Sequence, residues 1–122
     1  MTALSSLVPM VHVKNVPRSI EFYRKLSFTV GNIFVPAGQS EPSWGWLESG
    51  EARLMLTRSS EPVEPSRQAV LFYLYCEDVP EFRSELLGRG VEVGEIQYPF
   101  YSPRGEFRIT DPDGFTLMVS HT

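Results

Sequence analysis

The sequence predicts an α+β fold in which two tandem βαβββ modules form a curved mixed sheet, with the helices outside and a concave ligand groove inside. Three observations lead to this prediction: an internal repeat, the order of elements within each half, and a polar linker. The linker is residues 58–68, which are rich in Ser, Pro and charge and contain one apolar residue, Val63. We therefore expect a single domain over residues 1–122, with module 1 at about 5–58 and module 2 at about 69–122.

The two halves of the chain repeat each other at a spacing of 63 residues. The matching pairs are Val16-Pro17 with Val79-Pro80, Val30-Gly31 with Val93-Gly94, Pro36 with Pro99, and Leu54-Met55 with Leu117-Met118. Because the spacing is the same at each pair, the sequence predicts that the halves share element lengths as well as residue types.

The first half reads as strand, helix and three strands. Residues 8–14 have the composition of a strand and end at Asn15, a good helix N-cap. Pro17 lies in the first turn of the helix, where its missing N–H costs nothing. Apolar residues then recur at helical spacing, at Ile20, Tyr23 and Leu26. The three further strands are expected at about 28–35, 43–48 and 52–57.

The second half has the same order of elements. A strand is expected at residues 70–76, followed by Asp78 as an N-cap with Glu81 three residues later. Gly88 and Gly90 end the helix. The three further strands are expected at about 91–98, 106–110 and 115–120, the last two joined by an Asp-Pro-Asp-Gly turn.

Alternation along the strands predicts which side chains face the helices and which face the groove. The helix-facing set in the last strand of each half is Leu54, Leu56, Leu117 and Val119. The groove-facing set includes His12, Arg53, Met55, Tyr73, Tyr75 and Met118. Trp44 and Trp46 are interpreted as core residues, because the repeat aligns them with Phe107 and Ile109, and Arg108 then points into the groove.

Composition and charge exclude several classes of protein. The net charge is −4 and the 11 Lys and Arg residues are scattered, which argues against nucleic acid as a partner. No apolar run approaches the roughly 20 residues that span a membrane, and no secretory signal is visible. Cys76 is the only cysteine, so no intrachain disulfide forms, and we expect a cytoplasmic protein.

Two stretches resemble a known family. Residues 16–28, VPRSIEFYRKLSF, resemble the first helix of the glyoxalase/bleomycin-resistance/dioxygenase superfamily, also called the vicinal oxygen chelate superfamily. Residues 107–119, FRITDPDGFTLMV, resemble its closing hairpin. The resemblance implies paired βαβββ modules around an open cavity, and a homodimer. In metal-dependent members it also implies a divalent ion held by His, Gln or Glu on the first and last strands of each module.

The residues at those metal-ligand positions are all apolar. Carried over one at a time, the positions fall at Val8, Met55, Leu71 and Met118. Hydrocarbon and thioether side chains are poor ligands for a hard or borderline divalent ion. The sequence therefore predicts no metal and no cofactor. This departure argues against lyase, dioxygenase and metal-dependent fosfomycin-modifying activities, and leaves the bleomycin-resistance type, which binds its ligand without chemistry.

We therefore predict a metal-independent protein that binds a small apolar or aromatic molecule such as a drug. The candidate ligand-binding residues are His12, Arg53, Met55, Tyr73, Tyr75, Phe100, Tyr101, Arg108 and Met118. An enzyme of the same superfamily is the alternative, either a lyase, an isomerase or a dioxygenase-like protein. It would use His12 or a tyrosine as acid or base, or a metal at other positions. A third reading is a regulatory domain whose groove is filled by its own side chains.

Several of these residues also have a purely structural interpretation. His12 is either a general base or a histidine beside the groove, and the two methionines either line the groove or fill the core. Tyr73 and Tyr75 suit a ring-bearing ligand, but are also common on half-exposed strands. The loop at 99–105 is a candidate flap, in which Phe100 and Tyr101 require a ligand, a neighbouring subunit or a fold-back onto the core.

Overall fold

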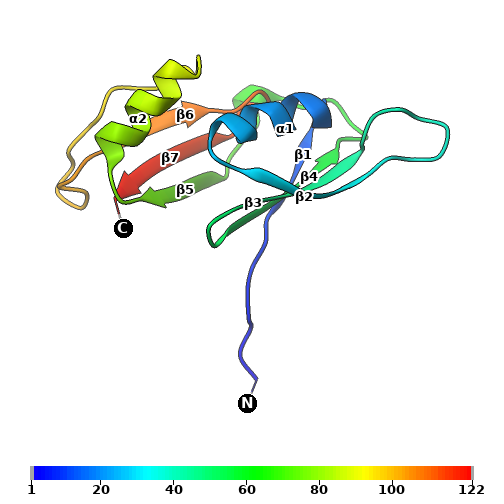
Figure 1. Cartoon of the computed structure of the whole chain (residues 1–122), viewed down its shortest axis with the longest axis horizontal. Helices are drawn as coiled ribbons and strands as arrows, with labels where there is room; N and C mark the ends of the chain where they lie inside the picture. The colour runs from blue at the N-terminus through cyan, green and yellow to red at the C-terminus, as the bar shows by residue number, and fades with distance from the viewer. Residues whose placement is uncertain (1, 122) are drawn as a thin grey trace. The chain divides into compact units, whose positions relative to one another are not determined.

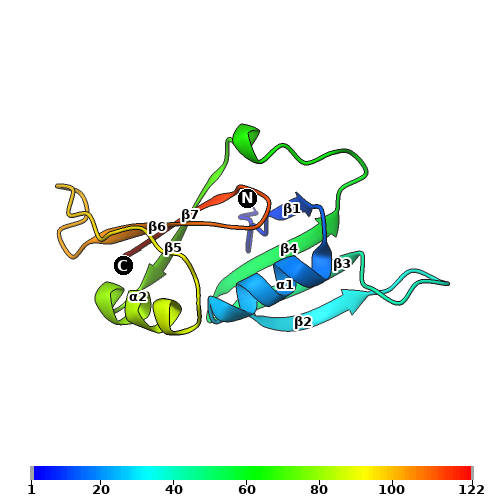
Figure 2. The same ribbon diagram turned by 90° about the horizontal axis from the view of Figure 1, so that it is seen from above.

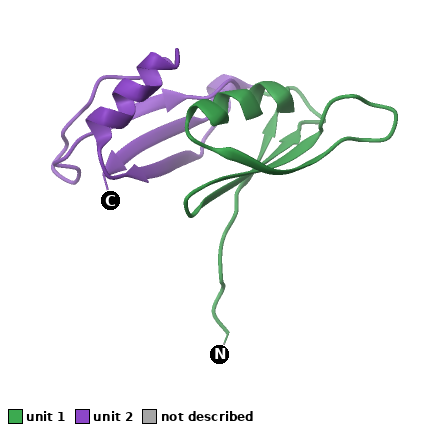
Figure 3. Cartoon of the chain, in the orientation of Figure 1, with its two compact units in different colours: residues 1–63 green, residues 64–122 purple. Residues whose placement is uncertain are grey.

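The computed structural model describes residues 2–121 and divides the chain into two compact units, residues 1–63 and 64–122 (Figure 3). The boundary between the units lies within the polar segment 58–68. Each unit has two layers, with one helix packed on one face of a mixed β-sheet (Figures 1 and 2). The predicted α+β class is therefore confirmed.

Unit 1 follows the predicted strand, helix and three-strand order. Its elements are β1 (Met10–Val13), α1 (Val16–Lys25), β2 (Thr29–Phe34), β3 (Trp44–Ser49) and β4 (Ala52–Arg58). The strands lie in the order β1-β4-β3-β2, with β1 parallel to β4 and the other neighbours antiparallel. Residues 2–9 precede β1 without regular structure.

Unit 2 has the same order of helix and outer strands but one regular strand fewer. Its elements are the 3-10 turn η1 (Pro65–Arg67), β5 (Leu71–Cys76), α2 (Val79–Gly88), β6 (Glu106–Thr110) and β7 (Thr116–His121). The strands lie in the order β5-β7-β6, with β5 parallel and β6 antiparallel to β7.

The prediction of a regular strand at residues 91–98 is wrong. Gly94 donates its N–H to the carbonyl of Arg108 over 2.9 Å, and Gln97 forms a single bridge with Glu106. Between these two contacts the segment advances by three residues, from Gly94 to Gln97, whereas β6 advances by two, from Glu106 to Arg108. The extra residue interrupts the strand pairing as a β-bulge does. Unit 1 has a related irregularity between Val30 and Asn32, but there the pairing resumes and β2 stays intact.

Both helices begin as the sequence predicts. The Oδ1 atom of Asn15 accepts the N–H of Arg18 over 2.9 Å, and the Oδ1 atom of Asp78 accepts the N–H of Glu81 over the same distance. Each cap satisfies one of the N–H groups that a helix start leaves without an intrahelical partner. A proline follows in the first turn of each helix. The helices are thus placed at matching points of the two modules.

The core of each unit lies between its helix and its sheet. As predicted, the helix-facing leucines and valine of the last strands are buried, at Leu54, Leu56, Leu117 and Val119. Tyr23 of α1 and Leu86 of α2 are buried against these faces, with 1% and 0% of their surfaces exposed. The opposite face of each sheet carries the remaining side chains and is available for other contacts.

The interpretation of Trp44 and Trp46 as core residues is wrong. Trp46 pairs with Met55 and Trp44 with Thr57, so both indoles lie on the sheet face away from α1. Leu47 lies on the core face instead and is fully buried. A shift of one residue exchanges the two faces of a strand, and the repeat spacing of 63 does not hold within this strand.

Candidate functional site

Four of the predicted site residues lie together on the open face of the unit 2 sheet. Tyr73 of β5 and Arg108 of β6 both pair with Met118 of β7, so the three side chains form one row across the strands. Tyr75 lies in the next row, opposite Ser120. Side chains directly opposite each other on one face are about 5 Å apart at Cβ, which places all four within reach of one small molecule.

The two tyrosines form an exposed aromatic surface. The rings of Tyr73 and Tyr75 stack with centroids 6.0 Å apart and planes at 25°. They remain 39% and 59% exposed, respectively. A stacked pair of exposed rings offers a flat apolar surface with two hydroxyl groups at its edge.

A hollow of about 600 Å³ adjoins this face. Met118, Arg108 and Glu106 contribute to it from the sheet. Tyr98 and Tyr101 contribute from the loop that precedes β6. Its volume falls in the range typical of small-molecule sites, and its lining combines apolar, aromatic and charged groups.

The loop over the hollow is tied to the sheet through Ser102 and is exposed at its tip. The Ser102 Oγ lies 2.9 Å from the Ser120 Oγ on β7, and the Ser102 backbone N–H donates to the carbonyl of Pro99. Phe100 is 95% exposed, so its ring does not fold back onto the core, and of the three predicted explanations a ligand or a neighbouring subunit remains. Its ring makes an edge contact with Tyr101, at 5.4 Å between centroids.

Glu106 is a site residue that the sequence analysis missed. It is 4% exposed, and its Oε1 atom accepts the hydroxyl of Tyr101 over 3.0 Å. The pKa of Tyr101 is raised above its usual value, chiefly because this hydrogen bond to the carboxylate favours the protonated phenol, with smaller effects from desolvation and from the charge of Glu106. The alternation with Arg108 was a signal that both residues share a face, but nothing in the sequence pattern indicated the contact with Tyr101.

The matching face of unit 1 carries the other predicted strand residues. Met10, Met55 and Trp46 form one row, and His12 pairs with Thr57 in the next. The His12 ring has no hydrogen bond or ion pair within residues 2–121, so no carboxylate orients it as a base. The structure thus exposes His12 but gives it no catalytic partner.

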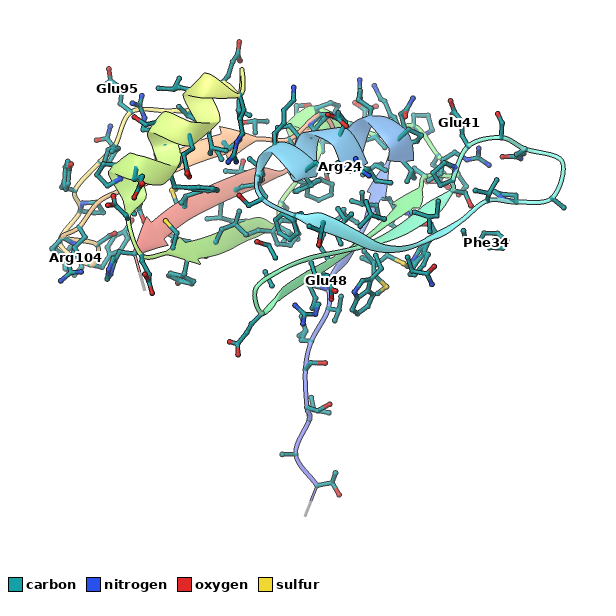
Figure 4. The ribbon with its side chains drawn as sticks, in the orientation of Figure 1. Arg24, Phe34, Glu41, Glu48, Glu95 and Arg104 are labelled. Carbon is teal, nitrogen blue, oxygen red and sulfur yellow. The ribbon has the colours of Figure 1, made fainter. Side chains whose placement is uncertain are left out.

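Arg53 is held within its own unit. Its Nε atom lies 3.0 Å from Oε2 of Glu48, and its Nη1 atom donates to the carbonyl of Gly50 over 2.6 Å. The same Glu48 oxygen accepts the indole N–H of Trp46 over 3.2 Å. Figure 4 labels Glu48 among the side chains of this sheet. Arg53 therefore supports the aromatic face rather than projecting freely from it.

The four family metal positions lie on or beside the open faces. Met55 and Met118 are half-buried within β4 and β7, while Leu71 is exposed at the start of β5 and Val8 precedes β1. Within residues 2–121, no three His, Cys, Asp or Glu side chains gather in a way that could hold a metal ion. Metal independence itself stays a prediction. The described part of the chain also has no helix with the length and apolar character needed to span a membrane.

Comparison with known families and structures gives consistent matches. The family model described as Glyoxalase/Bleomycin resistance protein/Dioxygenase superfamily matches residues 7–119. No match was found among curated proteins.

Several solved structures share the fold. A bleomycin-binding protein complexed with bleomycin is 18% identical, with 98% of this chain and 99% of that chain covered and a TM-score of 0.77. A bleomycin resistance determinant encoded on the transposon Tn5 is 17% identical, with 98% of each chain covered and a TM-score of 0.78. The bleomycin-binding protein from Streptomyces verticillus complexed with copper(II)-bleomycin is 16% identical, with 100% and 99% covered and a TM-score of 0.75.

Proposed function

Because this chain belongs to the glyoxalase/bleomycin resistance protein/dioxygenase superfamily, we propose that it is a metal-independent binding protein for a small organic molecule with an aromatic or apolar part. The observation that carries the proposal is the exposed stack of Tyr73 and Tyr75 beside a hollow of about 600 Å³. Exposed apolar surface of this kind is costly in water and is commonly covered by a ligand.

The proposed ligand lies across the rows of side chains on the open face of unit 2. A ring of the ligand packs on the two tyrosines, and Met118 adapts its flexible thioether to the ring edge. Arg108, which is exposed, is available for an anionic or carbonyl group. Phe100 and Tyr101 at the loop tip then cover the ligand from the side of the hollow.

The structural relatives support binding without chemistry as the mode of action. Two of them are described in complex with bleomycin or copper(II)-bleomycin. On the open faces of the described residues, His12 lacks an orienting partner and the family metal positions present hydrocarbon and thioether, which are poor ligands for a divalent ion. A homodimer and a cytoplasmic location belong to the same proposal, as properties implied by the family resemblance and the composition.

The test is a binding screen on the purified full chain. Bleomycin, copper(II)-bleomycin and a panel of planar aromatic compounds are screened by thermal shift, and each hit is titrated by isothermal calorimetry. We expect saturable binding that the double variant Tyr73→Ala/Tyr75→Ala weakens by about tenfold or more, because truncating a central aromatic contact typically costs at least 1–2 kcal/mol.

The matched control is Leu87→Ala, which removes another exposed apolar side chain, from the helix rather than the sheet face. This variant should bind as the parent does. Absence of any hit, or equal loss of affinity in both variants, would refute the proposed site. Stoichiometric metal that survives dialysis, measured by elemental analysis, would refute metal independence.

A further inference from the structure

The carboxylate of Glu106 has one oxygen without a hydrogen-bond partner. Within residues 2–121, no group donates to its Oε2 atom, which has essentially no exposed surface, while Oε1 accepts only the Tyr101 hydroxyl. A buried acceptor without a donor costs about 1–3 kcal/mol, and more when it is charged. A group of this kind in the lining of a hollow is suited to accept a hydrogen bond from a bound ligand.

Within residues 2–121, no Lys, Arg or His side chain forms an ion pair with the Glu106 carboxylate. Arg108 lies two residues away on the same strand face, but its side chain is exposed and forms no ion pair with Glu106 in the described part of the chain. The net charge of the chain is −4, which further favours cations over anions as ligands. The missing donor is therefore best supplied by a positively charged group.

The backbone holds Glu106 rigidly in position. The N–H of Glu106 donates to the carbonyl of Gln97 over 2.9 Å, and the N–H of Gln97 donates back to the carbonyl of Glu106 over 2.8 Å. On its other side Glu106 pairs with Ser120 of β7. A carboxylate on a strand that is paired on both sides is well suited to recognise a fixed donor geometry.

Tyr101 indicates the route by which a donor reaches this carboxylate. Tyr101 is 61% exposed, yet its hydroxyl reaches the buried Glu106, and both residues line the hollow. A ligand donor that displaces the Tyr101 hydroxyl takes its place at Oε1, beside the unpartnered Oε2. Two parallel oxygens of this kind match an amidinium or guanidinium group, which donates two hydrogen bonds at once.

We propose that Glu106 is the recognition residue for a cationic, hydrogen-bond-donating group of the ligand, of the amidinium or guanidinium type. This inference rests on the proposed binding of an aromatic molecule beside Tyr73 and Tyr75, and adds the charge that such a molecule carries. The preferred ligand is thus a flat ring system with a planar cation at the end that enters the hollow.

The experiment uses two probes that differ only in this group. Naphthalene-2-carboxamidine carries the amidinium, and naphthalene-2-carboxamide is its neutral counterpart of nearly the same shape. Both are titrated by calorimetry into the parent chain, into Glu106→Gln and into the control Glu92→Gln. Glu92 is an exposed carboxylate of the same unit that lies outside the lining of the hollow.

We expect the parent to bind the amidine at least about tenfold more tightly than the amide, since a hydrogen bond to a charged group is worth this much. Glu106→Gln should abolish the preference and Glu92→Gln should keep it. Equal binding of both probes by the parent would overturn the role of Glu106 but leave the aromatic site intact. Binding of neither probe would overturn both proposals together.

A second variant covers the case in which Glu106→Gln does not fold, as judged by circular dichroism. Tyr101→Phe removes the competing hydroxyl from a largely exposed side chain and leaves the carboxylate in place. The preference for the amidine over the amide should then be several-fold larger than in the parent. An unchanged or smaller preference would overturn the proposal.

Discussion

Substitution of Gly114 by alanine should destabilise unit 2 by about 2–5 kcal/mol. Gly114 has a φ of +88°, and a Cβ placed there would lie 2.5 Å from both the Cα and the carbonyl oxygen of Pro65. The positive φ costs an L-residue about 1–2 kcal/mol. The clash involves backbone atoms that no rotamer change can move, and overpacking of this kind costs about 1–3 kcal/mol more.

Gly90→Ala provides the control that separates these two costs. Gly90 has a φ of +79° in the same unit, but a Cβ there would meet nothing within 4 Å. The Gly90→Ala variant should therefore lose only the conformational part of the free energy of unfolding, about 1–2 kcal/mol. Urea unfolding followed by far-ultraviolet circular dichroism gives the free energy of unfolding of both variants. If Gly114→Ala were no less stable than Gly90→Ala, the segment around Pro65 would not be packed against the turn, and the reasoning would fail.

Three further predictions concern the core, the loop and the open face of unit 1. Leu86→Ala should lower the free energy of unfolding by about 2–5 kcal/mol in the same assay, because Leu86 is fully buried under α2; a loss below about 1 kcal/mol would contradict this. The pKa of Tyr101 should lie above the usual value of 10.0. The hydrogen bond to Glu106 therefore stabilises the fold below pH 10.0, and this stabilisation is lost as the pH rises through the raised pKa. An ultraviolet titration of the parent against Tyr101→Phe measures this, and ionisation at or below 10.0 would count against the contact. Gly31→Ala should displace the indole of Trp46 and change the tryptophan emission spectrum, because a Cβ there would lie 2.7 Å from the indole Cδ1; an unchanged spectrum would show that the indole is already mobile.

The sequence predicted the elements that depend on local chemistry. Asn15 and Asp78 cap their helices as expected, because an N-cap needs only a short polar side chain and the backbone that follows it. The buried faces of the last strands followed from period-two alternation of apolar residues. These features are encoded within a few residues, and a repeat in the chain makes each of them visible twice.

The register of β3 depended instead on the lengths of the loop before it and the turn after it, which differ between the two units by one residue in opposite directions. Leu47 pairs with Leu54, whereas its counterpart Ile109 pairs with Leu117, so the turn in unit 2 is one residue longer. The loop before β3 is correspondingly longer in unit 1, which restores the spacing of 63 on either side. A pattern of matches that brackets a strand therefore cannot reveal a shift inside it.

The candidate site was predicted in part for the same reason. Tyr73, Tyr75 and Met118 lie on strands whose alternation was correct, and the structure brings them together with Arg108 on one face. Glu106 was missed because its significance depends on Tyr101, and the path of an irregular loop is not encoded in a periodic pattern. The contact became visible only with the fold of residues 98–105.

The one-residue shift of β3 also bears on how a duplicated module diversifies. Where unit 1 places Trp44 and Trp46 on its open face, unit 2 places Glu106 and Arg108 at the matching points of its sheet. A paired insertion and deletion in two loops rotates a whole strand about its axis while every flanking element keeps its place. Because such a rotation exchanges the two faces of the strand, a change in two loop lengths alters the binding surface and the core together.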